Sequence, residues 1–135
     1  MKLLRYGPVG QERPGMLDTE RRIRDLSGYI PDLAAGALEP VRLASLRARP
    51  GRPAARRRRP RLGSCVTGTG KFICIGLNYA DHAAKTGMAL PAELGVVIGR
   101  GGKYISEQDA LGLVAGYCVI NDLSDRAFQL EGTGQ

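Results

Sequence analysis

The sequence predicts an α+β protein made mostly of β-strands, and two patterns support this prediction. Near the N-terminus, short strand-like segments alternate with Gly-Pro and Pro-Gly dipeptides, which mark turns. In the C-terminal half, three apolar runs are separated by segments that carry helix-start signals. The chain has 135 residues, of which 43% are hydrophobic, so it is long enough to form a modest core.

The first 47 residues are predicted to form a small antiparallel β domain. Strand patterns occupy Lys2–Tyr6, residues 15–18 and residues 22–26, and the turns between them favour a meander. Residues Pro40–Arg47 follow with apolar positions at mixed spacing, which predicts a helix of about two turns.

Residues 48–62 are predicted to be a linker rich in Arg and Pro. Residues 48–60 contain no large apolar side chain, so they cannot bury enough surface to offset their chain entropy. Nine of the Arg residues fall between Arg42 and Arg61, and they account for the formal net charge of +7. The alternative is a nucleic-acid-binding arm, but no aromatic residues are interleaved and no recognition helix is evident. The sequence therefore favours the linker.

Residues 63–135 are predicted to form the second domain. Buried strands are expected over residues 72–75, 94–98 and 117–120. A short helix is expected over residues 79–85, and a second over residues 106–114, where Ser106 and Asp109 form a capping pattern and the apolar residues face a core.

The cysteine pattern and the absence of sorting signals predict a cytoplasmic protein. Cys65, Cys74 and Cys118 form no CxxC pair and are odd in number, which suits a reducing compartment. The N-terminus lacks the apolar core of a signal peptide, and the longest nearly apolar stretch is too short to span a bilayer. We therefore expect no membrane association.

Two acidic residues adjoin predicted strands and suggest a metal site. Glu93 directly precedes one apolar run, and Asp122 closely follows another. Side chains at strand ends can converge in a pocket, and carboxylate oxygens prefer hard cations, which here favours Mg²⁺ or Mn²⁺. His82 is the only histidine, and it is a candidate general base for activating water. The alternatives are solvated acids and an ordinary surface histidine.

Several motifs, taken in order, resemble the fumarylacetoacetate hydrolase family. They are MKLLRYGPVGQERPG, RIRDLSG, KFICIGLNYADHA, ELGVVIG and GYCVINDLSDRAFQ. The resemblance implies a small N-terminal domain followed by part of a mixed β-roll catalytic domain. It also implies a homodimer and a small oxo-acid substrate.

The resemblance assigns roles to five residues. Glu93 and Asp122 match metal ligands for Mg²⁺ or Mn²⁺, and His82 matches the base that activates water. Arg126 and Gln129 match substrate-binding positions. The implied activity is hydrolysis of a C–C bond in a β-diketo or 2-oxo acid of the fumarylpyruvate or acylpyruvate type.

The sequence also departs from the family pattern. Pro91 stands where the family has another metal-binding Glu, and Lys85 replaces the Glu that pairs with the base. The connection between His82 and Glu93 is shorter than in the family, and the chain ends at Gln135, before the expected catalytic Lys. The alternatives are therefore an inactive relative, internally deleted and truncated, or an activity like ureidoglycolate lyase or 2-hydroxyhepta-2,4-diene-1,7-dioate isomerase.

Overall fold

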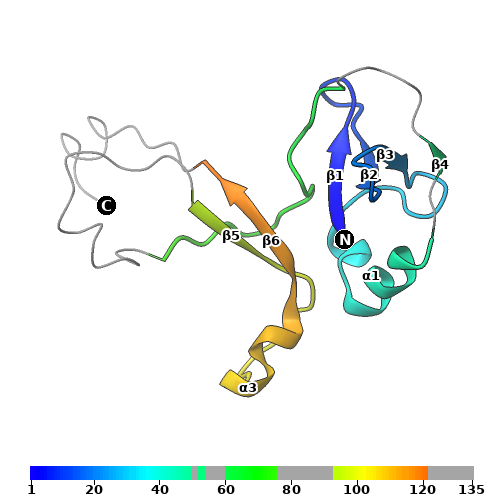
Figure 1. Cartoon of the computed structure of the whole chain (residues 1–135). Coiled ribbons are helices and arrows are strands. Elements are labelled where there is room, and N and C mark those ends of the chain that lie inside the picture. The colour runs from blue at the N-terminus through cyan, green and yellow to red at the C-terminus, as the bar shows by residue number, and fades with distance from the viewer. Residues whose placement is uncertain (50–51, 54–59, 76–92, 122–135) are drawn as a thin grey trace, which may run out of the picture. The chain divides into compact units, whose positions relative to one another are not determined.

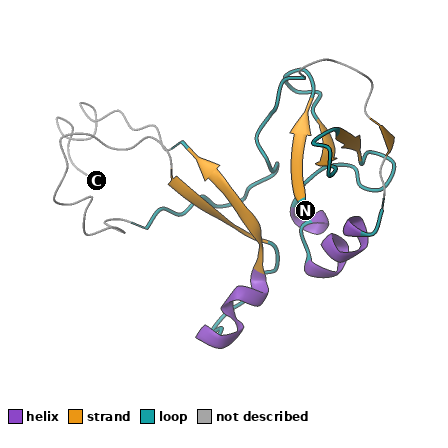
Figure 2. Cartoon of the chain, in the orientation of Figure 1, coloured by secondary structure: helices purple, strands orange, loops and turns teal. Residues whose placement is uncertain are grey.

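The computed structural model describes residues 1–49, 52–53, 60–75 and 93–121 (Figure 1). Strands predominate over short helices in these residues, as predicted (Figure 2). Four strands form one sheet, and two strands form another. In the part of the chain that is described, no helix has the length and apolar character needed to cross a membrane.

The first sheet contains β1 (Lys2–Tyr6), β2 (Arg13–Leu17), β3 (Ile23–Asp25) and β4 (Arg52–Pro53), in that order. Each strand is antiparallel to its neighbours, which confirms the predicted N-terminal meander. β2 begins earlier than its apolar pattern suggested, because Pro14 lies inside the strand and not in a turn. The carbonyl of Pro14 accepts a hydrogen bond from the backbone N–H of Leu26 at 2.9 Å.

A small apolar core lies beside this sheet. Helix α1 (Pro40–Arg47) has the predicted bounds, with Pro at a first-turn position where the missing N–H costs little. A 3₁₀ turn, η1 (Ala35–Ala37), precedes α1. Partly buried side chains of β1 and β2, Leu3 and Met16, pack against the core. The core itself consists of Leu26, Ile30, Leu33, Ala37 and Leu46.

The range predicted as a linker contains two segments that pair with the first sheet. β4 pairs with β3, with Arg24 opposite Pro53 and Asp25 opposite Arg52. Further along, Leu62 forms an antiparallel bridge with Tyr6, so the chain returns alongside β1. Residues 50–51 and 54–59 lie outside the described residues.

The second sheet is a hairpin of β5 (Glu93–Ile98) and β6 (Val114–Ile120). A Cβ atom placed on Gly95 would meet Ile120 and the Sγ of Cys118, whereas one on Gly99 would meet Ala115. Partners therefore move backwards along β6 as the chain advances along β5, so the two strands are antiparallel. The strands predicted over residues 94–98 and 117–120 are confirmed as strands.

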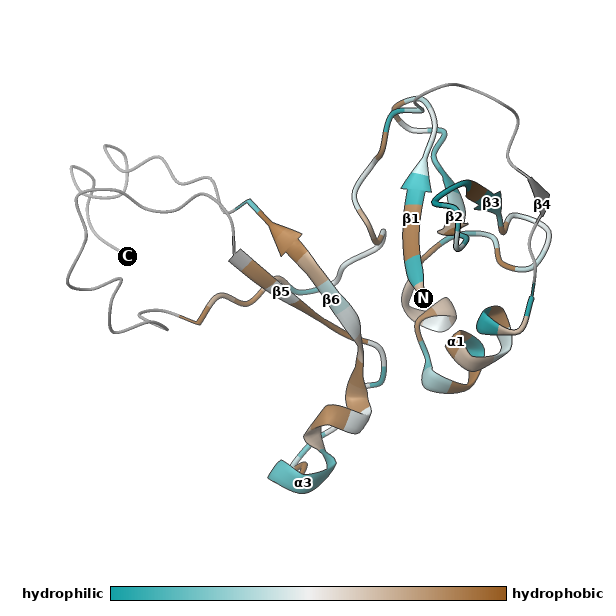
Figure 3. Ribbon diagram, viewed as in Figure 1, coloured by the Kyte–Doolittle hydropathy of each residue, from teal (hydrophilic) through white to brown (hydrophobic). Residues whose placement is uncertain are grey.

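The prediction that these two strands are buried is wrong. Alternate residues of both strands form one exposed surface, which we call the apolar face of the hairpin. Figure 3 shows the hydrophobic stretches along β5 and β6. In the described part of the chain, this sheet has only two strands, and one of its faces is left open. The residues of the apolar face and their exposed fractions are Leu94 64%, Val96 50%, Ile98 59%, Tyr117 61% and Val119 81%.

Two further predictions in this region are corrected by the structure. Residues 72–75 are neither a strand nor buried, and Ile73 is 76% exposed. A strand needs a hydrogen-bonded neighbour as well as a suitable composition, and no strand among the described residues pairs with this segment. The helix predicted over residues 79–85 lies outside the described residues.

The helix predicted over residues 106–114 is shorter than expected. Helix α3 covers only Glu107–Ala110, and a 3₁₀ turn, η2 (Leu111–Leu113), leads into β6. The predicted cap at Ser106 is confirmed, since its side chain accepts a hydrogen bond from the backbone N–H of Asp109 at 3.3 Å. The apolar residues were expected to face a core, but Leu111 is 74% exposed. Four helical residues are too few to present a continuous apolar stripe.

Candidate functional site

Of the five predicted site residues, only Glu93 belongs to the described part of the chain, where it begins β5. His82, Asp122, Arg126 and Gln129 lie outside the described residues. Their roles therefore remain predictions, and the hairpin supplies the backbone from which the site can be built.

The hairpin brings the start of β5 and the end of β6 to the same end of the sheet (Figure 1). Gly95 lies beside Cys118 and Ile120, so Glu93, two residues earlier, is level with the end of β6. The last described residue there is Asn121. Consecutive Cα atoms are about 3.8 Å apart, so Asp122 is bonded to a residue at the same end as Glu93.

The donor set expected at this end of the hairpin fits a hard cation. Glu93 and Asp122 both carry carboxylates, the ligands that Mg²⁺ and Mn²⁺ prefer. Pro91, at the position where the family resemblance places a third carboxylate, has no side-chain oxygen. No group of three or more His, Cys, Asp or Glu residues able to hold a metal occurs within the described ranges.

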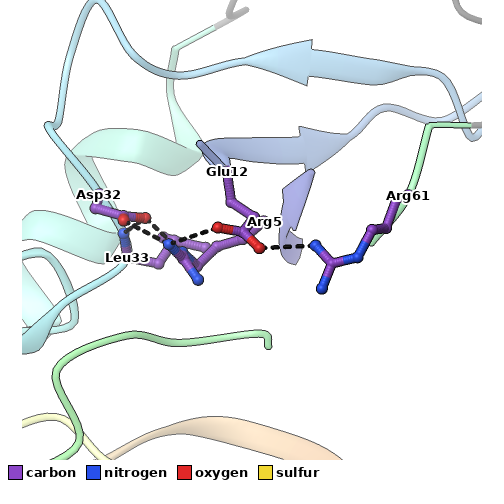
Figure 4. A network of polar contacts seen from close by, with 5 residues as sticks. All are labelled: Arg5, Glu12, Asp32, Leu33 and Arg61. Carbon is purple, nitrogen blue, oxygen red and sulfur yellow. Dashed lines mark hydrogen bonds and ion pairs between the residues drawn. The ribbon is translucent and has the colours of Figure 1, made fainter. Parts of the chain in front are cut away.

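The described residues also contain a polar network that sequence patterns did not reveal (Figure 4). Arg5 donates two hydrogen bonds to the carboxylate of Asp32, from Nε at 2.7 Å and from Nη2 at 2.9 Å. Glu12 lies 3.8 Å from Arg5 and accepts a hydrogen bond from Arg61 at 2.7 Å. Asp32 also accepts the backbone N–H of Leu33 at 2.7 Å.

The network ties together segments that are distant in the sequence. Arg5 comes from β1, and Glu12 directly precedes β2. Asp32 lies in the loop before η1, while Arg61 follows the Arg-rich segment. The hydrogen bond with Arg5 lowers the pKa of Asp32, so this carboxylate stays charged and is satisfied. We assign these residues a structural role because each charge is compensated within the network.

A partly buried polar pair has the same character. The hydroxyl of Tyr6 donates a hydrogen bond to Asp25 at 2.7 Å. Burial, reinforced by this hydrogen bond, raises the pKa of Tyr6 to about 12. A phenol that holds its proton this firmly is a poor general base near neutral pH. Its spacing of 19 residues from Asp25 gave no signal in the sequence.

Comparison with known proteins finds a family pattern in the second half of the chain. Residues 85–134 match the family model described as the fumarylacetoacetate (FAA) hydrolase C-terminal domain. The matched stretch contains Glu93, Asp122, Arg126 and Gln129, and it begins three residues after His82.

Full-length relatives give a second line of comparison. Proteins from Burkholderia ambifaria, Burkholderia multivorans and Burkholderia orbicola, whose names describe them as candidate hydrolases, are each 47% identical to this chain over 168 residues. The alignments cover 100% of this chain and 60% of each relative.

The length of these alignments tests whether this chain lacks an internal segment that its relatives have. They extend over 168 residues although this chain has only 135. The relatives therefore carry residues inside the aligned region that have no counterpart here, as expected for a chain with an internal deletion. The family model and the names of the relatives both describe hydrolases, and the chain is similar to the fumarylacetoacetate hydrolase family, most specifically over residues 85–134.

Proposed function

We propose that this chain belongs to a divalent-metal-dependent hydrolase that cleaves a C–C bond in a β-diketo or 2-oxo acid. One observation carries the proposal. Glu93 and the end of β6, next to Asp122, lie at the same end of the hairpin, inside the region that matches the family model.

In this proposal, Glu93 and Asp122 hold Mg²⁺ or Mn²⁺. The cation would supply positive charge where the oxygens of the oxo-acid become more negative. Arg126 follows Asp122 by four residues, and its planar guanidinium suits bidentate binding of a substrate carboxylate. Gln129, three residues further, offers an amide that can donate to a second oxygen.

His82 is proposed to accept a proton from water as the water oxygen attacks a carbonyl carbon. The C–C bond next to that carbonyl then breaks, giving a carboxylic acid, and the proton passes to the carbon that leaves. An imidazole suits this role because its ordinary pKa lies close to neutral pH. Lys85 stands three residues later, where a carboxylate would orient the ring, so we expect a weak base.

A second candidate is a family member that binds the metal but does not turn over substrate. Pro91 and Lys85 favour it, because one removes a metal ligand and the other places a positive charge where the base needs a negative one. Losing a group that orients a metal ligand or base typically lowers metal affinity or rate by about 10- to 100-fold, and losing a direct ligand should cost at least as much. The lyase and isomerase activities considered for the sequence would use the same metal site.

Metal binding is tested by following thermal unfolding during titration with Mg²⁺ and Mn²⁺. At a free metal concentration of about 100 times Kd, the free energy of unfolding should rise by about 2.7 kcal/mol. Glu93→Gln and Asp122→Asn should each abolish the rise. Glu107→Gln is the matched control, because Glu107 is an exposed acid on α3. An unchanged melting temperature in the parent chain would contradict both candidates.

Turnover separates the two candidates. An acylpyruvate should be hydrolysed in the presence of Mn²⁺ at a rate above that of His82→Ala, which loses the proposed base. Equal rates for the two proteins, together with intact metal binding, would leave the non-catalytic candidate. Adding Lys85→Glu should then raise the rate if the missing partner of His82 is the defect.

A further inference from the structure

We infer that a shallow hollow beside α1 binds a small phosphate-type oxyanion. The hollow has a volume of about 240 Å³ and is lined by residues of α1, of the loop before η1 and by Arg49, which follows α1. Its polar rim includes Tyr29, Arg42, Ser45 and Arg49, and the buried side chains of Ile30 and Leu46 contribute to its lining. Among the residues that the structure describes, no acidic one contributes to the lining.

The rim residues of α1 are placed by helical spacing. Arg42 and Ser45 are three residues apart on α1, and positions three apart lie on one side of a helix, so a guanidinium and a hydroxyl border the hollow together. Arg49 lies beyond the C-terminal end of α1, where it adds a second guanidinium to the rim. Arg47, which is on α1, does not line the hollow.

The position of one guanidinium is fixed by an aromatic ring. The guanidinium carbon of Arg49 lies 4.8 Å from the centroid of the Tyr29 ring. A cation over the face of an aromatic ring is attracted to it, which limits the freedom of the long side chain. The stacked guanidinium retains its N–H donors in the ring plane, so it can still bind an anion.

The two guanidinium groups are available for an external partner. Within the described ranges, every ion pair involves other residues, and neither Arg42 nor Arg49 contacts a carboxylate. Asp25 and Asp32 are already hydrogen-bonded to Tyr6 and Arg5. Glu39, which precedes Arg42 by three residues, forms none of the ion pairs within the described ranges. The positive charge of the rim is therefore not neutralised within these residues.

The size and chemistry of the hollow select the class of ligand. Sites for drug-sized ligands enclose roughly 300–1,000 Å³, so this smaller hollow suits a compact group. Guanidinium groups bind phosphate oxygens through paired hydrogen bonds, and the Ser45 hydroxyl can donate another. The ligand class is inorganic phosphate or a small phosphate monoester, and the same chemistry would recognise a phosphate of a nucleic-acid strand.

The test uses the full chain and inorganic phosphate, titrated by calorimetry at constant ionic strength with chloride as the balancing anion. Arg42→Ala and Arg49→Ala should each weaken phosphate binding by about tenfold or more. Tyr29→Ala should also weaken binding, because it releases Arg49, whereas Tyr29→Phe should retain most of the affinity. Arg47→Ala is the matched control, and it should leave binding unchanged.

The possible results of the phosphate titration lead to different conclusions. Loss in the two rim variants with retention in Arg47→Ala supports the site, provided that circular dichroism shows the fold is intact. No heat of binding for the parent chain, or equal weakening by all three Arg variants, overturns the inference. A short single-stranded oligonucleotide that competes with phosphate, and loses affinity in the same rim variants, identifies a nucleic-acid phosphate as the source. An oligonucleotide that does not compete leaves free phosphate.

Discussion

At the scale of single residues, Gly15 in β2 occupies a space that admits a side chain only if its neighbours shift. A Cβ atom at this position would lie 3.0 Å from two ring carbons of Tyr6 and 3.1 Å from the Cγ2 of Ile23. The Tyr6 ring cannot move away easily, because its hydroxyl is bonded to Asp25 at 2.7 Å. We expect Gly15→Ala to lower the free energy of unfolding by about 1–3 kcal/mol.

Urea denaturation of the purified variants would measure this loss. Gly36→Ala is the control, because a Cβ atom there would meet nothing within 4 Å. It should be neutral or stabilising by up to about 1 kcal/mol. Equal unfolding midpoints for Gly15→Ala and the parent chain would show that the sheet accommodates a methyl group at Gly15.

Asp18 makes the stability of the N-terminal turn depend on pH. Its carboxylate accepts the backbone N–H of Arg22 at 2.8 Å and the guanidinium groups of Arg22 and Arg24 at 3.1 and 3.0 Å. The backbone hydrogen bond from Arg22 is the main cause that lowers the pKa of Asp18 from 3.8 to about 2. The resulting stabilisation is complete above pH 3.8 and is lost as pH falls through 2.

Urea midpoints measured between pH 5 and pH 2 would test this dependence. The parent chain should lose stability steeply between pH 4 and pH 2, and Asp18→Asn should show a shallower loss from a lower starting point. Glu39→Gln, which removes an exposed acid without a side-chain capping bond, should keep the parent slope. Parallel slopes for the parent and Asp18→Asn would contradict this account.

Individual residues show which features of the candidate site and of the fold could be predicted from the sequence. Glu93, Asp122 and His82 were proposed because motifs place them next to recognisable segments. The bond from Arg5 to Asp32 joins residues 27 apart, and no local pattern specifies such a pair. The chemical type of a residue is visible in the sequence, but its partner is set by how the chain returns on itself.

At the scale of elements, the network around Arg5 contains three ion pairs among the described residues, and the Arg5–Asp32 and Arg61–Glu12 pairs should differ in strength. Arg5 is only 11% exposed, and it meets Asp32 through two short hydrogen bonds. Arg61 is 48% exposed and meets Glu12 through one. Partly buried, charge-assisted pairs gain from the lower local dielectric, whereas exposed pairs are screened by water.

Double-mutant cycles measured by urea denaturation would quantify the difference. The coupling energy between Arg5→Ala and Asp32→Ala should be about 1.5–3 kcal/mol. The coupling between Glu12→Ala and Arg61→Ala should be about 0.2–1 kcal/mol. A larger coupling for the Arg61 pair would mean that this contact, and not the Asp32 contact, holds the network together.

The bounds of the elements were predicted well wherever local signals specify them. β1 and α1 coincide with their predicted ranges, since turns and a first-turn proline mark their ends. Residues 72–75 had strand-like composition but no paired neighbour in the described structure. Composition predicts which backbone conformation a segment prefers, whereas pairing and burial depend on other parts of the chain.

At the scale of the whole molecule, the chain is shorter than its relatives, and this difference in length bears on the candidate metal site. This chain spans about 60% of the length of the curated relatives that it matches. The family match covers both predicted metal carboxylates, and it also covers Pro91 and Lys85, which stand where the family resemblance implies acids. Ancestry is thus readable from motif order, while activity depends on side chains that the motifs do not contain.

At the same scale, the apolar face of the hairpin should determine how strongly the chain binds hydrophobic ligands. Exposed apolar surface of this kind binds hydrophobic dyes, because both the dye and the protein leave water on contact. We expect the chain to enhance the fluorescence of anilinonaphthalene sulfonate under native conditions. Val96→Lys combined with Val119→Lys should remove most of the enhancement, since both residues lie on this face and are 50% and 81% exposed.

A control must separate this face from exposed apolar residues in general. Val41 in α1 is 79% exposed but does not belong to the hairpin, so Val41→Lys should leave the fluorescence nearly unchanged. Circular dichroism should match the parent chain in each variant, because all three valines are at least 50% exposed. Dye binding that persists after both hairpin substitutions would mean that another surface accounts for it.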